Sequence, residues 1–139
     1  MQQRDLIKEQ IEQAGRVLGK ILSGLAGWQT TASVQQTMNI VQRQFRSELD
    51  FDLEAWLQSE DDDQTDRLAR LPLPESALDE LASFLYEIGQ QFSMSGDPAA
   101  AQTHFRGARA VLDRVDAVSE TLTFERMDLR RAVEGAMDE

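Results

Sequence analysis

Cysteine is absent from this chain of 139 residues, which also has only three prolines and one histidine. Without cysteine the chain forms neither a disulfide framework nor a reactive thiolate, which fits a reducing compartment. No apolar run approaches the ~18 residues that a transmembrane helix needs. The apolar pair Leu6-Ile7 is followed at once by Lys8-Glu9, which breaks any signal-peptide core. We therefore expect a cytoplasmic protein that does not act at a membrane.

Positive charge is also scarce, because 14 basic residues face 25 acidic ones and the formal net charge is −11. Non-specific nucleic-acid binding takes most of its affinity from Lys and Arg on phosphates, so this balance argues against a nucleic-acid partner. The arginines of the C-terminal half are interleaved with acids, and we interpret the negative charge as a solubility feature. These arginines are Arg106, Arg109, Arg114, Arg126, Arg130 and Arg131.

The pattern that is present is helical. Apolar residues recur at three- and four-residue steps in Asp5–Ala26, which predicts a helix with one buried face. After a short break, Thr30 or Thr31 is the predicted cap of a second helix that runs to about Asp50. No segment shows the alternation of a strand. The apolar stripe of the second helix is Val34, Met38, Val41, Phe45 and Leu49.

The segment Phe51–Pro74 is less regular. Asp52–Leu57 is predicted to form a short helix, and the acidic run Glu60–Asp63 is a loop or a helix start. Arg67–Leu71 is predicted to close another short turn. The run Leu71-Pro72-Leu73-Pro74 cannot lie inside a helix, because proline lacks the N–H and restrains the residue before it. We interpret residues 51–74 as an irregular acidic connector with short helices.

A further helix is predicted to begin at Pro74 or Ser76, since Ser76 and Asp79 have the Ser-x-x-acid form of a capping box. Gly96 precedes Asp97-Pro98, a sequence typical of a turn followed by a helix with an Asp cap and a proline in its first turn. The apolar face of the helix before this turn is Leu78, Leu81, Leu85, Ile88 and Phe92.

The helix after the turn is predicted to end near Asp113. A last helix is predicted to begin at Ser119 or Thr121, either of which is a suitable cap, and to run to Ala136. It completes the set of amphipathic helices that the periodicity predicts. Its predicted buried stripe is Leu122, Met127 or Phe124, Leu129 and Val133.

The stretch Leu85–Asp113 resembles a tetratricopeptide repeat (TPR), a pair of packed antiparallel helices. Small residues stand where two helices must cross closely, and large aromatic residues fill the gap between them. The small residues are Gly89, Ala101 and Ala108, and the large ones are Phe92 and Phe105. The resemblance implies a helical hairpin that binds other proteins and carries no chemistry of its own.

The N-terminal half resembles a degenerate copy of the same repeat. Leu18-Gly19 and Leu22 match the core of its first helix, and Val34, Met38 and Val41 match the small-large-small run of its second, with larger residues. The alternative is that two unrelated amphipathic hairpins look alike because both follow the helical period. The sequence leaves both interpretations open.

The whole chain is also similar to an uncharacterised family of short bacterial proteins. These pair an amphipathic N-terminal segment, here Ile11–Gln13 and Arg16–Gly19, with a TPR-like helix pair. The resemblance implies a bacterial cytoplasmic protein and brings no assigned activity. We expect one all-α domain in which TPR-like antiparallel hairpins stack in a short right-handed array between N- and C-terminal capping helices. Its parts are a degenerate hairpin at 1–50, the connector at 51–74, and a TPR-like hairpin with a last helix at 75–139.

Catalysis has little support in the sequence. His104 has no Ser or Cys nucleophile signature to serve, so we interpret it as a surface or partly packed residue. Asp61–Asp63 and Asp66 form an acidic run that lacks the glycine and glutamate a helix-loop-helix calcium site needs, so we interpret it as a solvated loop. We therefore expect no catalytic centre, no cofactor and no metal ion.

The leading hypothesis is a non-catalytic protein–protein interaction or scaffold module. Tyr86 and Gln90 are expected on the inner face of the hairpin, where some TPR domains grip a peptide carboxylate with Lys and Asn. These two side chains supply no positive charge, which argues against that clamp. Trp28 and Trp56 are buried anchors or, where exposed, contact residues.

The alternative hypothesis is a small-ligand or enzymatic pocket between the helical hairpins, with Tyr86, Gln90 and His104 as its polar lining. His104 also belongs to the candidate partner-binding face. Under the leading hypothesis the partner is a protein. We expect a homodimer as well, because helical surfaces left over by so short an array would otherwise be exposed apolar patches.

Overall fold

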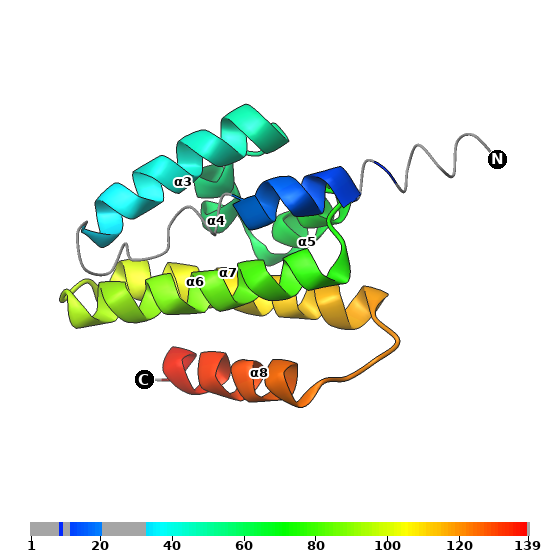
Figure 1. The fold of residues 1–139 in the computed structure, drawn as a ribbon. Helices are drawn as coiled ribbons and strands as arrows, with labels where there is room; N and C mark the ends of the chain where they lie inside the picture. Colours follow the sequence, from blue (N-terminus) through cyan, green and yellow to red (C-terminus); the bar gives the residue numbers. More distant parts are fainter. Residues whose placement is uncertain (1–8, 10–11, 21–32, 139) are drawn as a thin grey trace.

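The computed structural model describes residues 9, 12–20 and 33–138 (Figure 1). These residues form helices and short connections, with no strand among them, so the all-α expectation is confirmed for this part of the chain. Residues 12–20 are helical. The other helices are α3 Val34–Leu49, α4 Leu53–Gln58, α5 Asp61–Arg70, α6 Glu75–Met94, α7 Pro98–Val118 and α8 Phe124–Met137.

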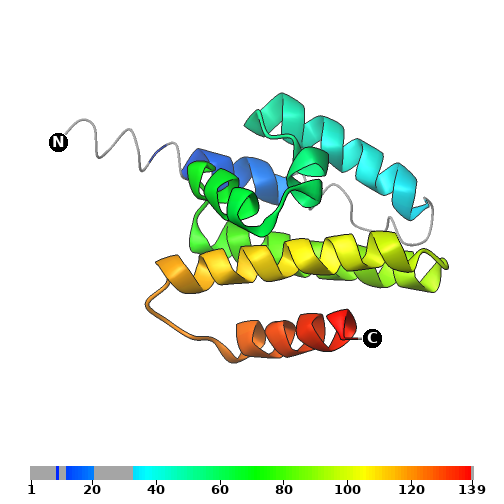
Figure 2. The same cartoon turned by 180° about the vertical axis from the view of Figure 1, so that it is seen from behind.

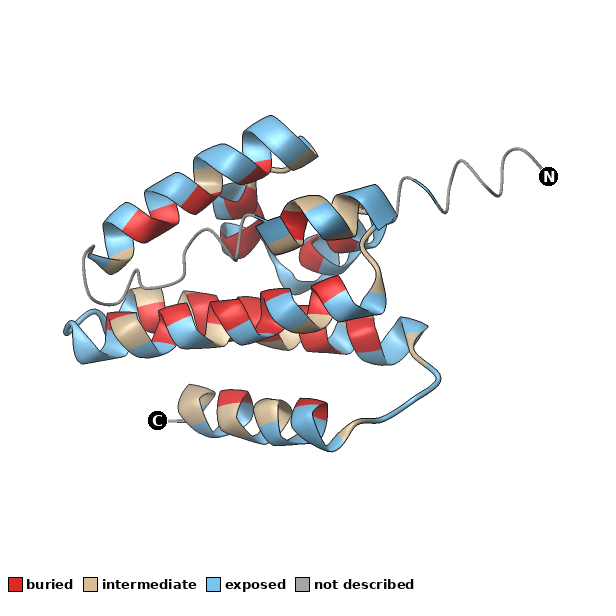
Figure 3. Ribbon diagram, viewed as in Figure 1, coloured by how far each residue is buried: buried red, intermediate tan, exposed pale blue. Residues whose placement is uncertain are grey.

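The antiparallel pair α6 and α7 is the centre of the molecule (Figure 1). Residues 12–20 and α3, α4 and α5 lie on one side of this pair, and α8 lies on the other, as the view from behind also shows (Figure 2). Buried residues recur along the length of both α6 and α7 (Figure 3). The hairpin is therefore the common support of everything else in the fold.

The turn between α6 and α7 forms as its sequence predicts. Gly96 adopts a φ of 85°, a conformation that favours glycine. Asp97 is the N-cap of α7, and its carboxylate accepts a hydrogen bond from the backbone N–H of Ala100 at 3.1 Å. Pro98 occupies the first turn, where a missing N–H costs nothing. These local signals fix the point at which the chain reverses.

Close approach of the two helices explains the glycine in the middle of α6. A Cβ added at Gly89 would lie 2.5 Å from Cε1 of Phe105 on α7, closer than carbon atoms pack. Gly89 is therefore small because the Phe105 ring occupies the space beside it. Ala101 and Ala108, the other small residues of the hairpin, are both buried.

The start of α6 agrees with the prediction, since Pro74 is its N-cap, but two other predictions for the hairpin are wrong. The capping box of Ser76 and Asp79 does not form, since no side chain caps α6. Asp79 instead bonds to Arg126 of α8, and that long-range ion pair replaces the local hydrogen bond. α7 continues for more than a turn past its predicted end near Asp113, because Val115 on the next turn is still fully buried.

α8 begins later than predicted. Its N-cap is Thr123, whose hydroxyl accepts a hydrogen bond from the backbone N–H of Arg126 at 3.1 Å. Ser119 and Thr121, the predicted caps, lie in the loop before the helix. There the Ser119 hydroxyl donates to a carboxylate oxygen of Glu75 at 2.7 Å. Ser119 thus holds the loop against the start of α6 instead of starting α8.

The buried stripe predicted for α8 is also largely wrong. Leu122 is 71% exposed and Phe124 is 82% exposed, and Met127 is exposed too. Val133 is buried as predicted and Leu129 is half-buried. The reason is that a charged side chain, described below, takes the inner position in the first turn of α8.

The N-terminal segments agree with the sequence where they are described. Leu18, within the helical residues 12–20, is fully buried. α3 is capped by Ser33, which forms a reciprocal capping box with Gln36, while the predicted caps Thr30 and Thr31 lie outside the described residues. The rest of the predicted helix Asp5–Ala26 also lies outside them. Buried residues of the predicted α3 stripe are Met38, Val41 and Phe45.

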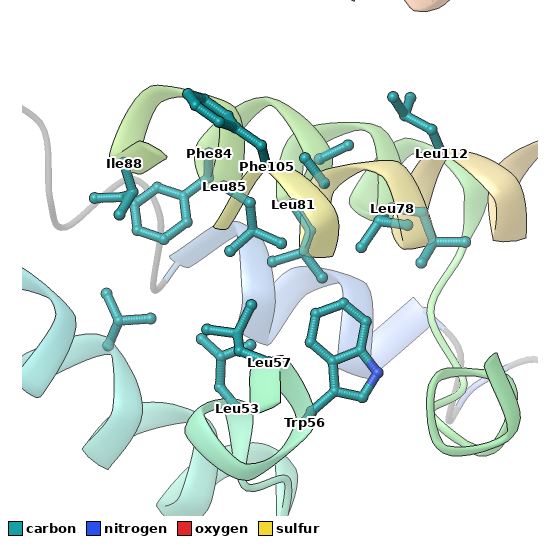
Figure 4. Close-up of a cluster of buried hydrophobic side chains, with 14 of the residues drawn as sticks. Leu53, Trp56, Leu57, Leu78, Leu81, Phe84, Leu85, Ile88, Phe105 and Leu112 are labelled. Carbon is teal, nitrogen blue, oxygen red and sulfur yellow. The ribbon is translucent and has the colours of Figure 1, made fainter. Parts of the chain in front are cut away.

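The predicted connector is more helical than expected and belongs to the core. α4 and α5 fill most of residues 51–74, and buried side chains of α4 lie beside those of α6 and α7 (Figure 4). Trp56 is only 1% exposed, and its indole N–H donates to the backbone carbonyl of Gln64 at 2.9 Å. The close-up labels Leu53, Trp56, Leu57, Leu78, Leu81, Phe84, Leu85, Ile88, Phe105 and Leu112.

A charged side chain of α7 helps to hold this connector in place. The Arg106 guanidinium Nη2 donates to the carbonyl oxygen of Leu57 at 2.9 Å and also to that of Ser59. These carbonyls lie at the C-terminal end of α4, where positive charge is favourable. On the same face, a Cβ added at Gly107 would lie 2.6 Å from Cδ2 of Leu57, so glycine here allows α4 to pack closely on α7.

Candidate functional site

A groove of about 490 Å³ lies between α6 and α8, with α7 at its base. Its lining combines apolar carbon surface with amide, hydroxyl and guanidinium groups. Tyr86, Gln90 and Ser93 come from α6, and Ala101, Gln102 and Phe105 from α7. α8 contributes Arg131, Ala132, Gly135 and Ala136. Since three helices contribute, the groove depends on how α8 docks against the hairpin.

The two candidate contact residues of α6 lie together in this groove. Tyr86 and Gln90 stand four residues apart on one helix face, and the Gln90 amide nitrogen donates to the Tyr86 hydroxyl oxygen at 2.9 Å. The Tyr86 ring packs against Phe105 of α7, with ring centroids 5.8 Å apart. Tyr86 is half-buried while Gln90 is exposed. The pair therefore offers a fixed aromatic edge and a free amide oxygen to a partner.

The side of the groove that α8 forms contains a charged residue that the sequence analysis did not place there. Arg131 lines the groove with a side chain that is 74% exposed, and its contact to Asp128 is long at 3.5 Å. None of the residues that line the groove in the described chain is acidic. The groove therefore carries a positive charge, which Tyr86 and Gln90 do not supply. That charge comes from a helix distant in sequence from α6.

Arg126 anchors α8 to α6. Its side chain is 3% exposed, and its Nε and Nη2 donate to the two carboxylate oxygens of Asp79 at 2.9 Å each. Nη2 also reaches Glu75 at 2.8 Å, and Nη1 donates to the carbonyl of Thr121. These bonds raise the pKa of Arg126 above its ordinary value, chiefly through Asp79. The guanidinium thus stays charged while it fixes the position of α8.

Along the rest of α8 the contacts are also polar. Arg130 bonds to Asp113 at 2.9 Å and to Asp116 at 2.6 Å, both on α7. The Gln102 amide of α7 donates to the backbone carbonyl of Ala136 at 3.0 Å. Ion pairs and hydrogen bonds therefore supply much of the attachment of α8, and only a few apolar side chains add to it.

His104, which the sequence predicted to be a surface or partly packed residue, is not at the surface but buried. It is 7% exposed, and its ring lies against Phe92 with centroids 4.9 Å apart. Nδ1 lies 2.7 Å from the carbonyl oxygen of Ala100, so the neutral ring donates there. Burial lowers the pKa of His104, and the bond to Ala100 and the charge of Asp97 oppose that effect.

We predict that His104 makes the fold less stable in mild acid. Because the pKa of His104 is lower in the folded state than in the unfolded state, the stability associated with its neutral ring is fully present above the unfolded-state pKa of about 6.5. That stability is lost as the pH falls below this value. Between pH 7.5 and 5.5 the loss is at most about 1.4 kcal/mol. Urea unfolding of the wild type and of His104→Phe at both pH values measures it. An equal loss in both proteins would contradict the prediction.

The structure separates the three residues of the alternative pocket hypothesis. Tyr86 and Gln90 line the groove beside α8, whereas His104 lines a different cavity on the other side of the hairpin, against α3 and α4. Neither of these two pockets is lined by all three residues. The positions of these residues along α6 and α7 did not reveal the separation, because the hairpin has two opposite faces and each helix contributes side chains to both.

Of the two tryptophans, the structure describes Trp56. Trp56 is a buried core residue, so of its two interpretations the buried anchor is confirmed and the contact residue is wrong. Trp28 lies outside the described residues.

The acidic run Asp61–Asp63 forms the exposed first turn of α5, where negative charge stabilises a helix, and Asp63 pairs with Arg67 at 3.2 Å. In the described ranges, no three His, Cys, Asp or Glu side chains form a group that could hold a metal ion.

Comparison of the chain with protein families, with curated proteins and with solved structures found no match. Among the helices of residues 9, 12–20 and 33–138, none is long and apolar enough to cross a membrane. The function is therefore argued from the geometry of the groove.

Proposed function

We propose that this chain is a non-catalytic interaction module that binds a segment of a protein partner in the groove between α6 and α8. The observation that carries the proposal is the groove itself, which has a volume of about 490 Å³ and is lined by residues of three helices. Its base is apolar and its rim is polar, the combination that interfaces between proteins use.

The arrangement of the last three helices supports a TPR-like interpretation. α6 and α7 supply the two helices of one repeat, with Gly89 and Phe105 at their crossing. α8 packs mainly on α7 and also touches α6, as a capping helix would. In this arrangement the groove lies on the inner face of the hairpin, which is the surface that helical repeats use for binding.

The lining indicates the chemistry of the partner segment. Phe105 and Ala101 accept an apolar side chain, and Tyr86 and Gln90 offer hydrogen bonds to its backbone. Arg131 is the charged group of the lining, so a carboxylate on the segment would find a counter-ion there. The proposed ligand is an extended or helical segment that carries an apolar anchor beside an acidic group.

A substitution at Gly135 tests the proposal with little risk to the fold. No atom lies within 4 Å of a Cβ added there, so a large side chain extends into open space. We expect Gly135→Trp to fill the groove and Tyr86→Ala to remove an anchor, and each to weaken partner binding at least tenfold. Binding is measured by titration with the protein that the immobilised wild-type chain retains from its native host.

The matched control is Ala69→Trp, which adds the same side chain at an exposed position of α5 away from the groove. It should bind the partner as the wild type does. Unchanged affinity of Gly135→Trp, with loss in Ala69→Trp, would place the contact surface elsewhere and reject the groove.

A further inference from the structure

The outer side of α8 carries a stripe of exposed residues, and α8 is the outer helix on its side of the hairpin (Figures 1 and 2). Successive members of this stripe stand three or four positions apart, so they lie along one side of the helix. The fully buried Val133 lies on the opposite side, toward the hairpin. The α8 stripe consists of Phe124, Asp128, Arg131 and Gly135.

The α8 stripe has a large apolar side chain at one end and open space at the other. Phe124 is 82% exposed, and Leu122 and Met127 beside it in sequence are exposed too. Gly135 lies about three turns further along. No atom lies within 4 Å of a Cβ added there, and Gly135 also lines the groove. One end therefore presents a ring without cover, and the other presents space for one.

The two ends of the α8 stripe fit each other when two copies of α8 pack antiparallel. Phe124 of one copy then lies opposite Gly135 of the second copy, and Asp128 lies opposite Arg131. Both pairs are centred on the same point, midway along the stripe. A single two-fold axis through that point therefore satisfies both pairs, and the symmetry makes each contact twice.

The charges of the stripe favour the antiparallel arrangement. Asp128 and Arg131 are 72% and 74% exposed, and their contact within one chain is long at 3.5 Å. In the antiparallel pair, two carboxylates and two guanidinium groups meet around the axis, so each carboxylate lies beside a guanidinium of the second copy. A parallel pair in register would set Asp128 against Asp128 and Arg131 against Arg131, which is repulsive.

The first turns of α8 also have the chemistry proposed for the segment that binds in the groove, an apolar anchor beside an acidic group. Phe124 is followed directly by Glu125 and, one turn later, by Asp128. Arg131 lines the groove and is the counter-ion for Asp128 of the second copy. The exposed Met94 of α6 also lines the groove and adds apolar surface for the Phe124 ring.

We propose that the groove binds a second copy of this chain, whose α8 packs antiparallel on α8 and places Phe124 at Gly135. This inference rests on the proposed function, because it names the segment that the groove binds. Each copy completes the groove of the other, so the dimer contains two equivalent sites. One helix face is a small interface, so we expect a Kd on the order of 10 µM and a monomer in dilute solution.

Sedimentation equilibrium of the full chain over a range of concentrations from about 1 to 500 µM, on both sides of the expected Kd, tests the proposal. The average mass should rise from 15.7 kDa toward twice that value. Phe124→Ala and Gly135→Trp should each raise the Kd at least tenfold, because the symmetry places each change in the interface twice. A wild-type chain that stays at 15.7 kDa throughout rejects the proposal.

The matched control is Ile40→Ala, which truncates an exposed apolar residue of α3 on the other side of the hairpin. It should leave the Kd unchanged. Circular dichroism of each variant confirms that the helices are retained. Equal Kd values for Phe124→Ala, Gly135→Trp and the wild type would reject the α8 stripe as the interface.

An exchange of charge tests the antiparallel register. Asp128→Arg alone sets arginine against arginine, and Arg131→Glu alone sets acid against acid, so each should raise the Kd at least tenfold. An equal mixture of the two variants should form a heterodimer with nearly the wild-type affinity, because every cross-pair is again of opposite charge. Mixing would not repair a defect in folding. A mixture that stays monomeric would overturn the proposed packing of α8.

The outcomes also separate this inference from the proposed function. Suppose that the chain stays monomeric while Gly135→Trp weakens binding of a different protein from the host. The groove then remains the binding site, and the second copy is rejected as its partner. Self-association that Gly135→Trp leaves unchanged would place the contact between copies outside the groove, and it rejects the inference whatever the host protein does.

Discussion

Replacing Trp56 with alanine should lower the free energy of unfolding by about 3–5 kcal/mol, the range for removal of a large aromatic side chain from a core. Trp56 is 1% exposed and packs against Phe51 at a centroid separation of 6.2 Å. The change also leaves the carbonyl of Gln64 without the indole donor it has at 2.9 Å. Cavity formation and the lost hydrogen bond act in the same direction.

Urea unfolding followed by far-UV circular dichroism measures this loss. The control is Phe124→Ala, in which a side chain that is 82% exposed is truncated with an expected change within about 0.5 kcal/mol. Trp56→Phe should fall between the two, because it keeps most of the ring volume and loses the indole N–H. A loss below that of Phe124→Ala would mean that Trp56 is not the core anchor its burial indicates.

The importance of Trp56 also shows why the sequence underestimated residues 51–74. The short helix predicted at Asp52–Leu57 is confirmed as α4, but α5, with ten residues, is too short for its helical period to be recognised with certainty. α4 and α5 are stabilised by contacts that the local sequence does not contain. Arg106, which lies 49 positions after Leu57, bonds to its carbonyl, and Gln64 bonds back to Trp56. Tertiary contacts thus outweighed the irregular local pattern.

The α6–α7 hairpin was predicted far better, because its determinants are local. The turn depends on Gly96, Asp97 and Pro98, which are adjacent in sequence. The close crossing depends on matched residue sizes, Gly89 against Phe105, at a spacing that a helical hairpin dictates. Such features can be read from the sequence because neighbours in the chain are also neighbours in space.

The groove was only half predictable for the same reason. Tyr86 and Gln90 share a face of one helix, so their i,i+4 spacing places them together. Arg131 reaches the groove because of the position of α8 against the hairpin. α8 contains several arginines, and its composition did not indicate that Arg126 would be the buried one that fixes this position. The signal that was present is Arg126 three residues after the capping Thr123, a position on the inner side of the first turn.

The expected result of Arg126→Met is a loss of about 2–3 kcal/mol in the free energy of unfolding, since a buried guanidinium with four hydrogen bonds is removed. The loss is smaller than for a fully buried ion pair, because Asp79 and Glu75 are 39% and 43% exposed and can regain water. Methionine fills much of the same volume. α8 should detach most readily, and the groove beside it should be lost.

Hydrogen exchange of the α8 amides and urea unfolding test this together. The control, Arg131→Met, removes a side chain that is 74% exposed and should change stability by less than about 0.5 kcal/mol.

The dependence of the stability difference on pH is a second check. The bonds from Ser119 and Arg126 lower the pKa of Glu75, so its contribution is present above the ordinary value of 4.5 and is lost as the pH falls through the lowered one. The difference between wild type and Arg126→Met should therefore shrink in acid, and a difference that grows instead would show that α8 is held by its apolar contacts.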